Sequence, residues 1–324
     1  MKRNNTIEDD YVEFSVYRGT RSNRETIDHQ YLPDTKKQKS VMWVSATKIY
    51  NAMTNDHLVD WLNQYGKNML NRKDSIEAKE LMDYLCKRGI DFEAEVDKYI
   101  KTKCHTESVT QYYSIDAVEQ TKQYMQHGVP VILSASVANT SSATFGIADA
   151  LVRSDYLNVI FQNPVISEED SKIKAPKLSG QYHYRVVEIK YSTIPLTSTN
   201  NIQNQPKFMA YKGQVCIYNE AIGKMQGYTP TTAYIVGRKV RNWNLETKQY
   251  ETTTHAMAKP GYIDFENADN NIIELTKQAV SWYRMVQRKG AKWTVYPPSI
   301  SELYPNMRVE SGKWNSVKLD IAKK

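Results

Sequence analysis

The stretches FGIADALVRSD at residues 145–155 and YHYRVVEIKYS at residues 182–192 decide the fold of this chain. Both are rich in β-branched residues or alternate in polarity, which is typical of strands in a partly buried sheet. A third stretch of the same texture, VPVILSASVA at residues 129–138, precedes them. The sequence therefore predicts three consecutive strands at the centre of one sheet.

Two of these predicted strands carry acidic residues among apolar ones. Glu188 and Lys190 are two positions apart, so their side chains point to one face of the strand, and Val187 and Ile189 point to the other. Asp149 stands alone in the apolar run GIADALV, where a buried charge is costly without a compensating partner. Either a bound metal or a cross-strand ion pair with Lys190 supplies such a partner, and the residue pattern leaves both alternatives open.

The metal alternative has a clear chemical use. Hydrolysis of a phosphodiester is helped by a divalent cation that offsets phosphate charge and lowers the pKa of an attacking water. Magnesium prefers carboxylate oxygens, and a nearby ammonium group can stabilise developing charge. The E-x-K spacing also occurs at Glu77–Lys79 and Glu246–Lys248. The apolar strand setting, and not the spacing, therefore distinguishes Glu188 and Lys190.

Helical patterns surround the three strands. Before them we expect a helical stretch that begins near Thr47 and includes Leu58 and Trp61. It is followed by a helix at about 75–87, which has Leu81, Tyr84 and Leu85 inward and is ended by Gly89. A third helix is expected at about 89–101, with Glu93 at the edge of an apolar stripe made by Phe92, Val96, Tyr99 and Ile100. A fourth helix is expected at about 115–127. Residues 156–182 read as an inserted polar loop. After the strands we expect a helix at about 205–226, a strand at 231–240 and a helix at about 267–288.

This order predicts an α/β fold with a mixed central sheet flanked by helices and an open edge lined by Asp149, Glu188 and Lys190. Gln214 and Tyr218 are four apart on the helix that follows the third strand, so they lie on one face of it.

At this point the sequence resembles the RecB-like, lambda-exonuclease-like branch of the PD-(D/E)XK nuclease superfamily. That branch shows G-x-x-x-H or G-x-x-x-E on a helix, Asp on a strand, (D/E)-x-K on the next strand and Q-x-x-x-Y on the following helix. The corresponding elements, over roughly residues 85–240, are Gly89 to Glu93, Gly146 to Asp149, Glu188 to Lys190 and Gln214 to Tyr218. The resemblance implies a restriction-endonuclease-like core of the order αβββαβ.

The resemblance also implies roles for single residues. Asp149 and Glu188 would bind Mg²⁺ or Mn²⁺, helped by the backbone carbonyl of Ile189, and Glu93 would be a further ligand. Lys190 would act on the attacking water. Gln214 and Tyr218 would position the substrate strand and the catalytic residues. Glu93 stands where many members of the branch carry histidine, and Ala148 stands in place of the proline that names the superfamily.

Composition sets further bounds. The 324 residues carry a formal net charge of +7, which suits a polyanionic partner. The expected partner is DNA, single- or double-stranded, with linear ends. We expect no membrane span, because no stretch approaches the ~20 apolar residues required, and an intracellular location. Cys86, Cys104 and Cys216 offer no iron–sulfur ligand set.

The sequence divides into a polar arm at 1–40, a nuclease domain at 41–295 and a C-terminal extension at 296–324 that looks truncated. Abundant Asn, Tyr and Lys suggest an AT-rich genome, such as that of a large DNA virus or phage.

The sequence alone leaves three alternative functions. The first is a metal-dependent deoxyribonuclease, an exonuclease in preference to an endonuclease, with a place in DNA repair or recombination. The second is a catalytically inactive nuclease fold that binds nucleic acid within a larger DNA-processing assembly. The third is a structural or virion protein in which Glu188 and Lys190 form an ion pair. Retention of every charged position at the predicted site favours the first over the second.

Overall fold

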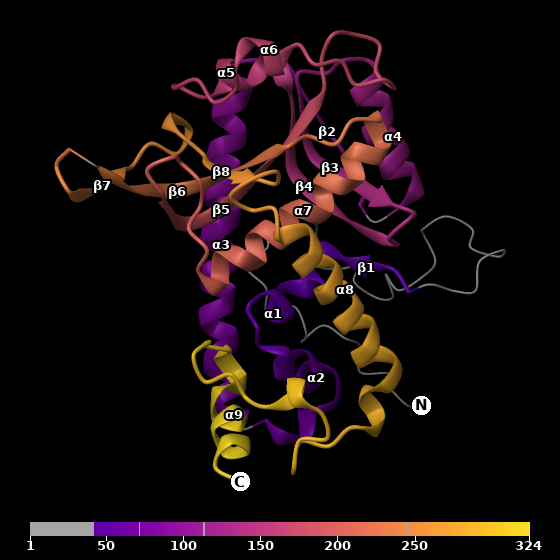
Figure 1. Cartoon of the computed structure of the whole chain (residues 1–324), viewed down its shortest axis with the longest axis vertical. Helices are drawn as coiled ribbons and strands as arrows, with labels where there is room; N and C mark the ends of the chain where they lie inside the picture. Colours follow the sequence, from indigo (N-terminus) through magenta and orange to yellow (C-terminus); the bar gives the residue numbers. More distant parts are fainter. Residues whose placement is uncertain (1–41, 71, 113, 245) are drawn as a thin grey trace.

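The computed structural model describes residues 42–70, 72–112, 114–244 and 246–324 as an α/β structure with a mixed, open sheet flanked by helices (Figure 1). The predicted arm at 1–40 lies outside the described residues. The strands run in the order β2-β3-β4-β5-β6-β7, with β1 added to β4 and β8 to β6. Their bounds are β1 Val44–Ser45, β2 Thr106–Ser108, β3 Val131–Asn139, β4 Thr144–Arg153, β5 Tyr184–Leu196, β6 Thr232–Asn244, β7 Gln249–Thr253 and β8 Gly261–Asp264.

The sheet contains both antiparallel and parallel pairs of strands. The pairs β3–β4 and β4–β5 are antiparallel, whereas β2–β3 and β5–β6 are parallel. The α-helices are α1 Tyr50–Met53, α2 His57–Tyr65, α3 Arg72–Lys101, α4 Ile115–Gln126, α5 Leu157–Ile160, α6 Glu168–Ser171, α7 Pro206–Gln226, α8 Ile272–Lys289 and α9 Asn315–Ala322. The short 3-10 helices are η2 Ala46–Ile49, η3 Lys67–Met69, η4 Ser154–Tyr156, η5 Ala256–Ala258, η6 Gly290–Lys292, η7 Ser301–Leu303 and η8 Gly312–Trp314.

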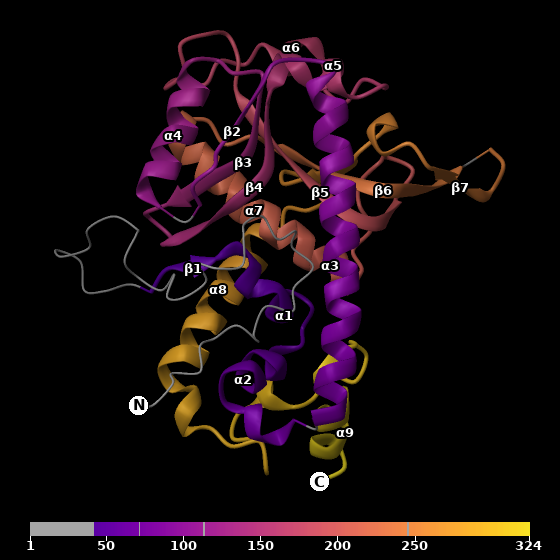
Figure 2. The ribbon, with the colours of Figure 1, turned by 180° about the vertical axis from the view of Figure 1, so that it is seen from behind.

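Helices cover both faces of the sheet. On one face, Val215 and Ile222 of α7 share a buried cluster with Leu151 and Val186 of the central strands. On the other face, Phe92, Val96 and Ile100 of α3 pack with Val187 and Ile189. Figure 1 shows α7 in front of the sheet, and the reverse view in Figure 2 shows α3 there instead. The central strands are therefore buried on both sides.

The predicted strands at 129–138, 145–155, 182–192 and 231–240 are confirmed as β3, β4, β5 and β6, and the helices at 115–127 and 205–226 as α4 and α7. Gly128 and Gly227 follow these two helices with φ of 70° and 79°, the left-handed conformation that glycine adopts most readily.

The predicted helix break at Gly89 is wrong. Residues 72–101 form the single helix α3, and Gly89 lies buried inside it. A glycine in a helix interior costs only about 1 kcal/mol, and the buried stripe that ends at Ile100 anchors the helix on the sheet. The N-terminal half of α3 extends beyond the sheet (Figure 2). Leu81 and Tyr84 are each 61% exposed there, so their predicted inward orientation is also wrong.

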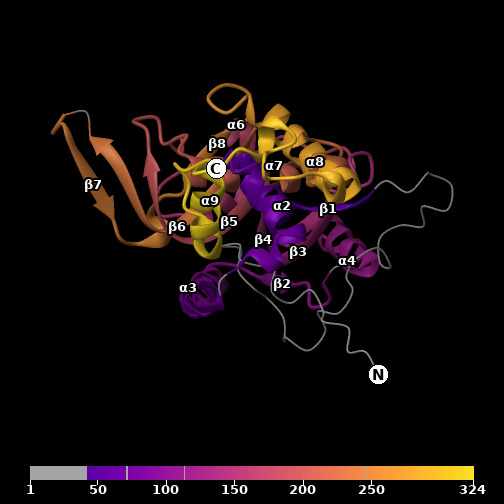
Figure 3. The same ribbon diagram turned by 90° about the horizontal axis from the view of Figure 1, so that it is seen from below.

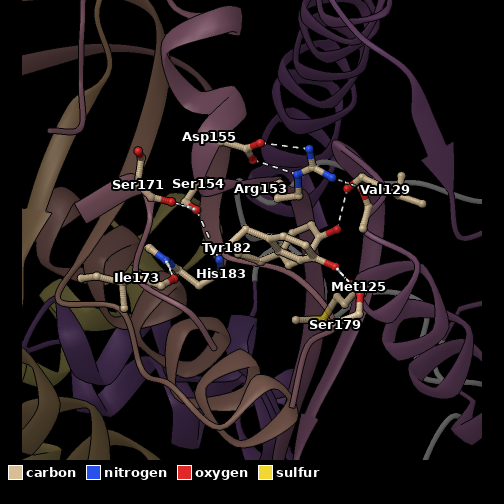
Figure 4. Close-up of polar contacts among 12 residues, drawn as sticks. Met125, Val129, Arg153, Ser154, Asp155, Ser171, Ile173, Ser179, Tyr182 and His183 are labelled. Atoms are coloured by element: carbon tan, nitrogen blue, oxygen red, sulfur yellow. Dashed lines mark hydrogen bonds and ion pairs between the residues drawn. The ribbon is translucent and has the colours of Figure 1, made fainter. Parts of the chain in front are cut away.

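The insertion between β4 and β5 contains short helices and is tied down by hydrogen bonds, whereas the sequence predicted only a polar loop. It contains α5 and α6. Figure 4 shows Ser154 Oγ donating to the Ser171 carbonyl at 2.6 Å and accepting from the His183 N–H at 3.2 Å. Tyr182 Oη donates to the Met125 carbonyl at 3.2 Å. Both ends of the insertion are thereby fixed to the sheet and to α4.

A third cluster joins the C-terminal segment to α2 and α8. Trp61, Trp282, Trp314 and Val317 are among its buried members. The predicted C-terminal extension at 296–324 thus packs against the helices at this end of the molecule (Figure 1). No helix in the described ranges has the length and apolarity needed to cross a membrane.

Asp60 is a buried acid within this helical part, and it predicts a pH-dependent stability. Its carboxylate accepts from Asn51 Nδ2 at 2.8 Å and from Trp282 Nε1 at 2.9 Å. Burial is the main cause that raises its pKa from 3.8 to about 7. The folded protein therefore keeps a proton that the unfolded chain releases. The stability gained is fully present below about pH 4 and is lost as the pH rises through 7.

We expect thermal unfolding of Asp60→Asn to depend less on pH between 5 and 8 than unfolding of the unchanged protein. Melting curves across this range, with Asp320→Asn at an exposed position as the matched control, measure the difference. Equal pH slopes for Asp60→Asn and the unchanged protein would show that Asp60 does not hold this proton.

Candidate metal centre

The predicted site residues meet where β4 and β5 part. The antiparallel ladder between these strands runs from Arg153 paired with Tyr184 to Ala150 paired with Val187. Asp149 and Glu188 are the next residue on each strand, just beyond the last pair. Farther along, β4 pairs with β1, and β5 continues beside β6 with a register shift between Lys190 and Thr193. Asp149 and Glu188 thus lie at the opening of the gap between the two strands.

The two carboxylates hold the end of the ladder together. Asp149 Oδ2 accepts from the backbone N–H of Ile189 at 2.7 Å, and Glu188 Oε2 accepts from the backbone N–H of Asp149 at 3.4 Å. Each acid therefore bonds to the strand that carries the other acid. This exchange places two hard oxygen donors from neighbouring strands side by side, as the sequence predicts.

Three further predicted residues contact Glu188 directly or through one neighbour. Lys190 Nζ donates to Glu188 Oε1 at 2.7 Å, and Gln214 Nε2 donates to the same oxygen at 3.0 Å. Gln214 Nε2 also lies 2.8 Å from Tyr218 Oη. The four-residue spacing on α7 thus places both side chains on the face of the helix that covers the sheet. The E-x-K pair and the Q-x-x-x-Y pair belong to one connected hydrogen-bond network.

The site is closed, so the predicted open edge is wrong. Asp149 is 6% exposed, and Glu188 and Lys190 are each 1% exposed. α7 covers this face of the strands, and η2 and α1 pack against α7 in turn. Burial of the sheet on both faces is the physical reason, because residues that point away from α3 point into the α7 layer.

Burial and mutual repulsion perturb the acid at the centre of the network. Burial and, second, the charge of Asp149 raise the pKa of Glu188 from 4.5 to about 7, against the opposing effect of Lys190. Two acids and one ammonium group leave this buried cluster with an excess of negative charge when all are ionised. A cation bound between Asp149 and Glu188 would compensate that excess. The two carboxylates supply the hard oxygen ligands that a divalent ion such as Mg²⁺ prefers.

Glu93, the predicted further ligand, is buried on α3. Its side chain is 3% exposed, and Phe92 beside it packs in the cluster on the α3 face. Within the described ranges, no group of three or more His, Cys, Asp or Glu side chains is arranged to hold a metal ion. The carboxylates available together are those of Asp149 and Glu188, and the role predicted for Glu93 stays a prediction.

A strained residue on β3 lies beside Asp149 and was not predicted. Ser134 has φ of 53°, and the flanking pairs Leu133–Ala150 and Ala135–Ala148 place it opposite Asp149. A residue with a side chain in this conformation costs about 1–2 kcal/mol. Leu133 and Ala135 belong to clusters on opposite faces although they are two apart. Ser134 thus reverses the strand's alternation next to the site, and nothing in its sequence signals this.

Gly146, the glycine of the predicted G-x-x-D element, makes room for Tyr218. A Cβ on Gly146 would lie 2.4 Å from Cε1 of Tyr218 and 3.3 Å from Cβ of Ala46. The absent side chain lets the Tyr218 ring approach β4 closely, and the Tyr218 hydroxyl accepts from Gln214 of α7. This close approach gives a physical reason for glycine three residues before Asp149.

We expect Gly146→Ala to lower the free energy of unfolding by about 1–3 kcal/mol, because the added methyl displaces the ring of Tyr218. Denaturant unfolding measures the loss. The double variant Gly146→Ala with Tyr218→Ala should lose less stability than the sum of the two single losses, because the clash with the ring is gone. Strict additivity of the two losses would contradict the contact.

Comparison with known proteins adds no family assignment. No family model matches the sequence, and no curated protein matches it.

Proposed function

We propose that this chain is a divalent-metal-dependent nuclease that hydrolyses phosphodiester bonds of DNA on a restriction-endonuclease-like core. One observation supports this most strongly. Asp149 and Glu188 bond to each other's strands at the end of the β4–β5 ladder, with Lys190 on Glu188. An ion pair alone needs one acid and one base. The second acid and the raised pKa of Glu188 favour a cation at this place.

Each residue of the site would have a separate role in hydrolysis. Asp149 and Glu188 would hold Mg²⁺ or Mn²⁺, and the bound ion would activate a water and offset phosphate charge. Lys190 Nζ lies 2.7 Å from a Glu188 oxygen, so its ammonium group would be close to a water activated there and would stabilise the charge that develops. Gln214 fixes the orientation of Glu188, and Tyr218 fixes Gln214. The backbone carbonyl of Ile189 and the side chain of Glu93 are the further ligands proposed from the family resemblance.

Arginines on the α3 side of β5 and on the β6–β7 hairpin support a polyanionic partner. Tyr191, the residue after Lys190, lies under the guanidinium of Arg238 at 4.9 Å and of Arg88 at 5.7 Å from its ring centroid. The β6–β7 hairpin projects from the sheet (Figures 1 and 3) and carries Arg241 at 4.8 Å over the ring of Tyr250. Arginines held on aromatic rings are suited to phosphate contacts. We therefore propose DNA as the partner of this surface.

The test uses purified protein with labelled linear DNA and closed circular DNA of the same sequence, in Mg²⁺, Mn²⁺ or EDTA. A nuclease cuts linear DNA with metal and leaves it intact in EDTA. Survival of the closed circle assigns exonuclease action, which we favour, and its cleavage assigns endonuclease action. Intact DNA in every metal would contradict the proposed activity.

A second function is favoured by the burial of the site. Because Glu188 and Lys190 are each 1% exposed, the cluster also suits a purely structural ion pair in a nucleic-acid-binding protein. That function predicts DNA binding without cleavage and a melting temperature unchanged by Mg²⁺ or Mn²⁺.

A further inference from the structure

The outer end of the β6–β7 hairpin carries two aromatic rings outside the core. Trp243 of β6 pairs with Tyr250 of β7, and their ring centroids lie 5.0 Å apart at an interplanar angle of 73°. Tyr250 is 51% exposed, and Trp243 is half-buried. The hairpin extends away from α7 and α8 (Figures 1 and 3), and neither ring belongs to a buried cluster of the described residues.

Arg241 shares one face of the hairpin with the two rings. It lies two positions before Trp243 on β6, it is exposed, and its guanidinium lies 4.8 Å from the ring centroid of Tyr250. Glu251, the acid of β7, is the next residue after Tyr250 and points to the opposite face, where it accepts from Asn244. The face with the rings is therefore cationic and aromatic, whereas the other face carries an amide and a carboxylate.

The ring contacts leave flat aromatic surface open to solvent. A cross-strand aromatic pair stabilises a hairpin through the contact between the rings. The T-shaped contact covers a face of one ring, and Arg241 covers a face of Tyr250, so these two contacts take at most two of the four ring faces. The half-exposed ring of Tyr250 thus remains available beside a guanidinium group.

An unpaired nucleic-acid strand matches this combination of groups. Its bases can stack on aromatic rings, and its phosphates can contact an arginine next to them. Bases inside a duplex are stacked on their neighbours and present only their edges in the grooves. An open ring face beside a cation therefore favours a single strand over a duplex.

We infer that the hairpin face formed by Arg241, Trp243 and Tyr250 binds an unpaired strand, with one base stacked on the open ring surface and one phosphate on Arg241. Nucleic acid as the ligand rests on the proposed function. The strand is held outside the closed metal centre, so binding on the hairpin requires no movement of α7.

The experiment measures binding in EDTA, where metal-dependent cleavage does not contribute. A fluorescently labelled oligothymidylate is titrated with the unchanged protein, Tyr250→Thr and Tyr250→Phe. Tyr304→Thr, at a 65% exposed tyrosine of the C-terminal segment, is the matched control. Threonine suits a strand and removes the ring. We expect Tyr250→Thr to weaken binding by about 5–150-fold, the loss of one stacked base, and the other two variants to bind within about twofold of the unchanged protein.

Salt dependence separates the charge contact from stacking. Arg241→Gln should lower the slope of log affinity against log salt by about 0.7, the value for one phosphate contact on a single strand. Tyr250→Thr should leave this slope unchanged, because a stacked base releases no counterion. Arg308→Gln, at an exposed position of the C-terminal segment, is the control and should change neither affinity nor slope.

A further measurement uses the unchanged protein and altered DNA. Thymidines are replaced one at a time by abasic units, and one position should weaken binding more than its neighbours, whereas Tyr250→Thr should be insensitive to that position. Unchanged affinity of Tyr250→Thr for the single strand, no sensitive position, or a loss confined to the strand annealed to oligodeoxyadenylate would overturn the stacking site. Metal-dependent cleavage together with any of these results leaves the nuclease standing. Tyr250-dependent binding without cleavage in any metal would support the stacking site and overturn the nuclease alone.

Discussion

Lys190→Ala and Asp149→Asn are each expected to lower metal-dependent DNA cleavage by at least about 10²–10³-fold, the usual loss when one preorganised group that stabilises the transition state is removed. Lys190 supplies the ammonium group next to Glu188, and Asp149 supplies one of the two carboxylates. Initial rates on labelled linear DNA in Mg²⁺ and Mn²⁺ measure the effect. Asp149→Asn should also weaken Mn²⁺ binding in a calorimetric titration, whereas Lys190→Ala should retain it.

The chain offers a matched control for this prediction. Glu77 and Lys79 have the same E-x-K spacing on α3, and Lys79 is exposed. Lys79→Ala should therefore cleave at the rate of the unchanged protein. If Lys190→Ala and Asp149→Asn both kept that rate, the reaction centre would lie elsewhere in the molecule.

Lys318→Ala is expected to lower the free energy of unfolding by about 3–5 kcal/mol, because it leaves a buried carboxylate without its partner. Lys318 Nζ donates to Asp56 Oδ2 at 2.7 Å, and both side chains are 1% exposed. The same ammonium group donates to Ser311 Oγ at 2.8 Å and to the Val309 carbonyl at 2.9 Å. It thereby connects α9 and the preceding segment to the start of α2.

Urea unfolding followed by circular dichroism measures this loss. Lys323→Ala at an exposed position of the same segment is the control and should change stability by less than about 0.5 kcal/mol. The double variant Lys318→Met with Asp56→Asn should recover much of the loss, because no buried charge remains unpaired. A loss below about 1 kcal/mol for Lys318→Ala would contradict a structural role for the pair.

Local pattern was enough to predict the centre of the sheet. The β-branched runs fixed β3, β4 and β5, and the period-four pair Gln214 and Tyr218 fixed the side of α7 that meets Glu188. These features depend on strand and helix periodicity, which the sequence carries directly. Short edge strands such as β1 and β8 lack enough residues to show a period, and their pairing depends on distant partners.

Other features depend on the tertiary structure and have no local signal. Gly89 reads as a helix end, yet burial of the following turns on the sheet carries α3 through it. The closure of the site follows from packing of α7, η2 and α1, which no single segment encodes. The left-handed conformation of Ser134 likewise has no signal in the residues around it.

The most direct measurement is anomalous diffraction from crystals soaked in Mn²⁺. The proposed function predicts a manganese peak between the carboxylates of Asp149 and Glu188, with Lys190 next to the ion's waters, and loss of the peak in Asp149→Asn. A structure at saturating Mn²⁺ in which these two carboxylates bind no ion, and Lys190 stays on Glu188, would contradict a metal-dependent centre at this place.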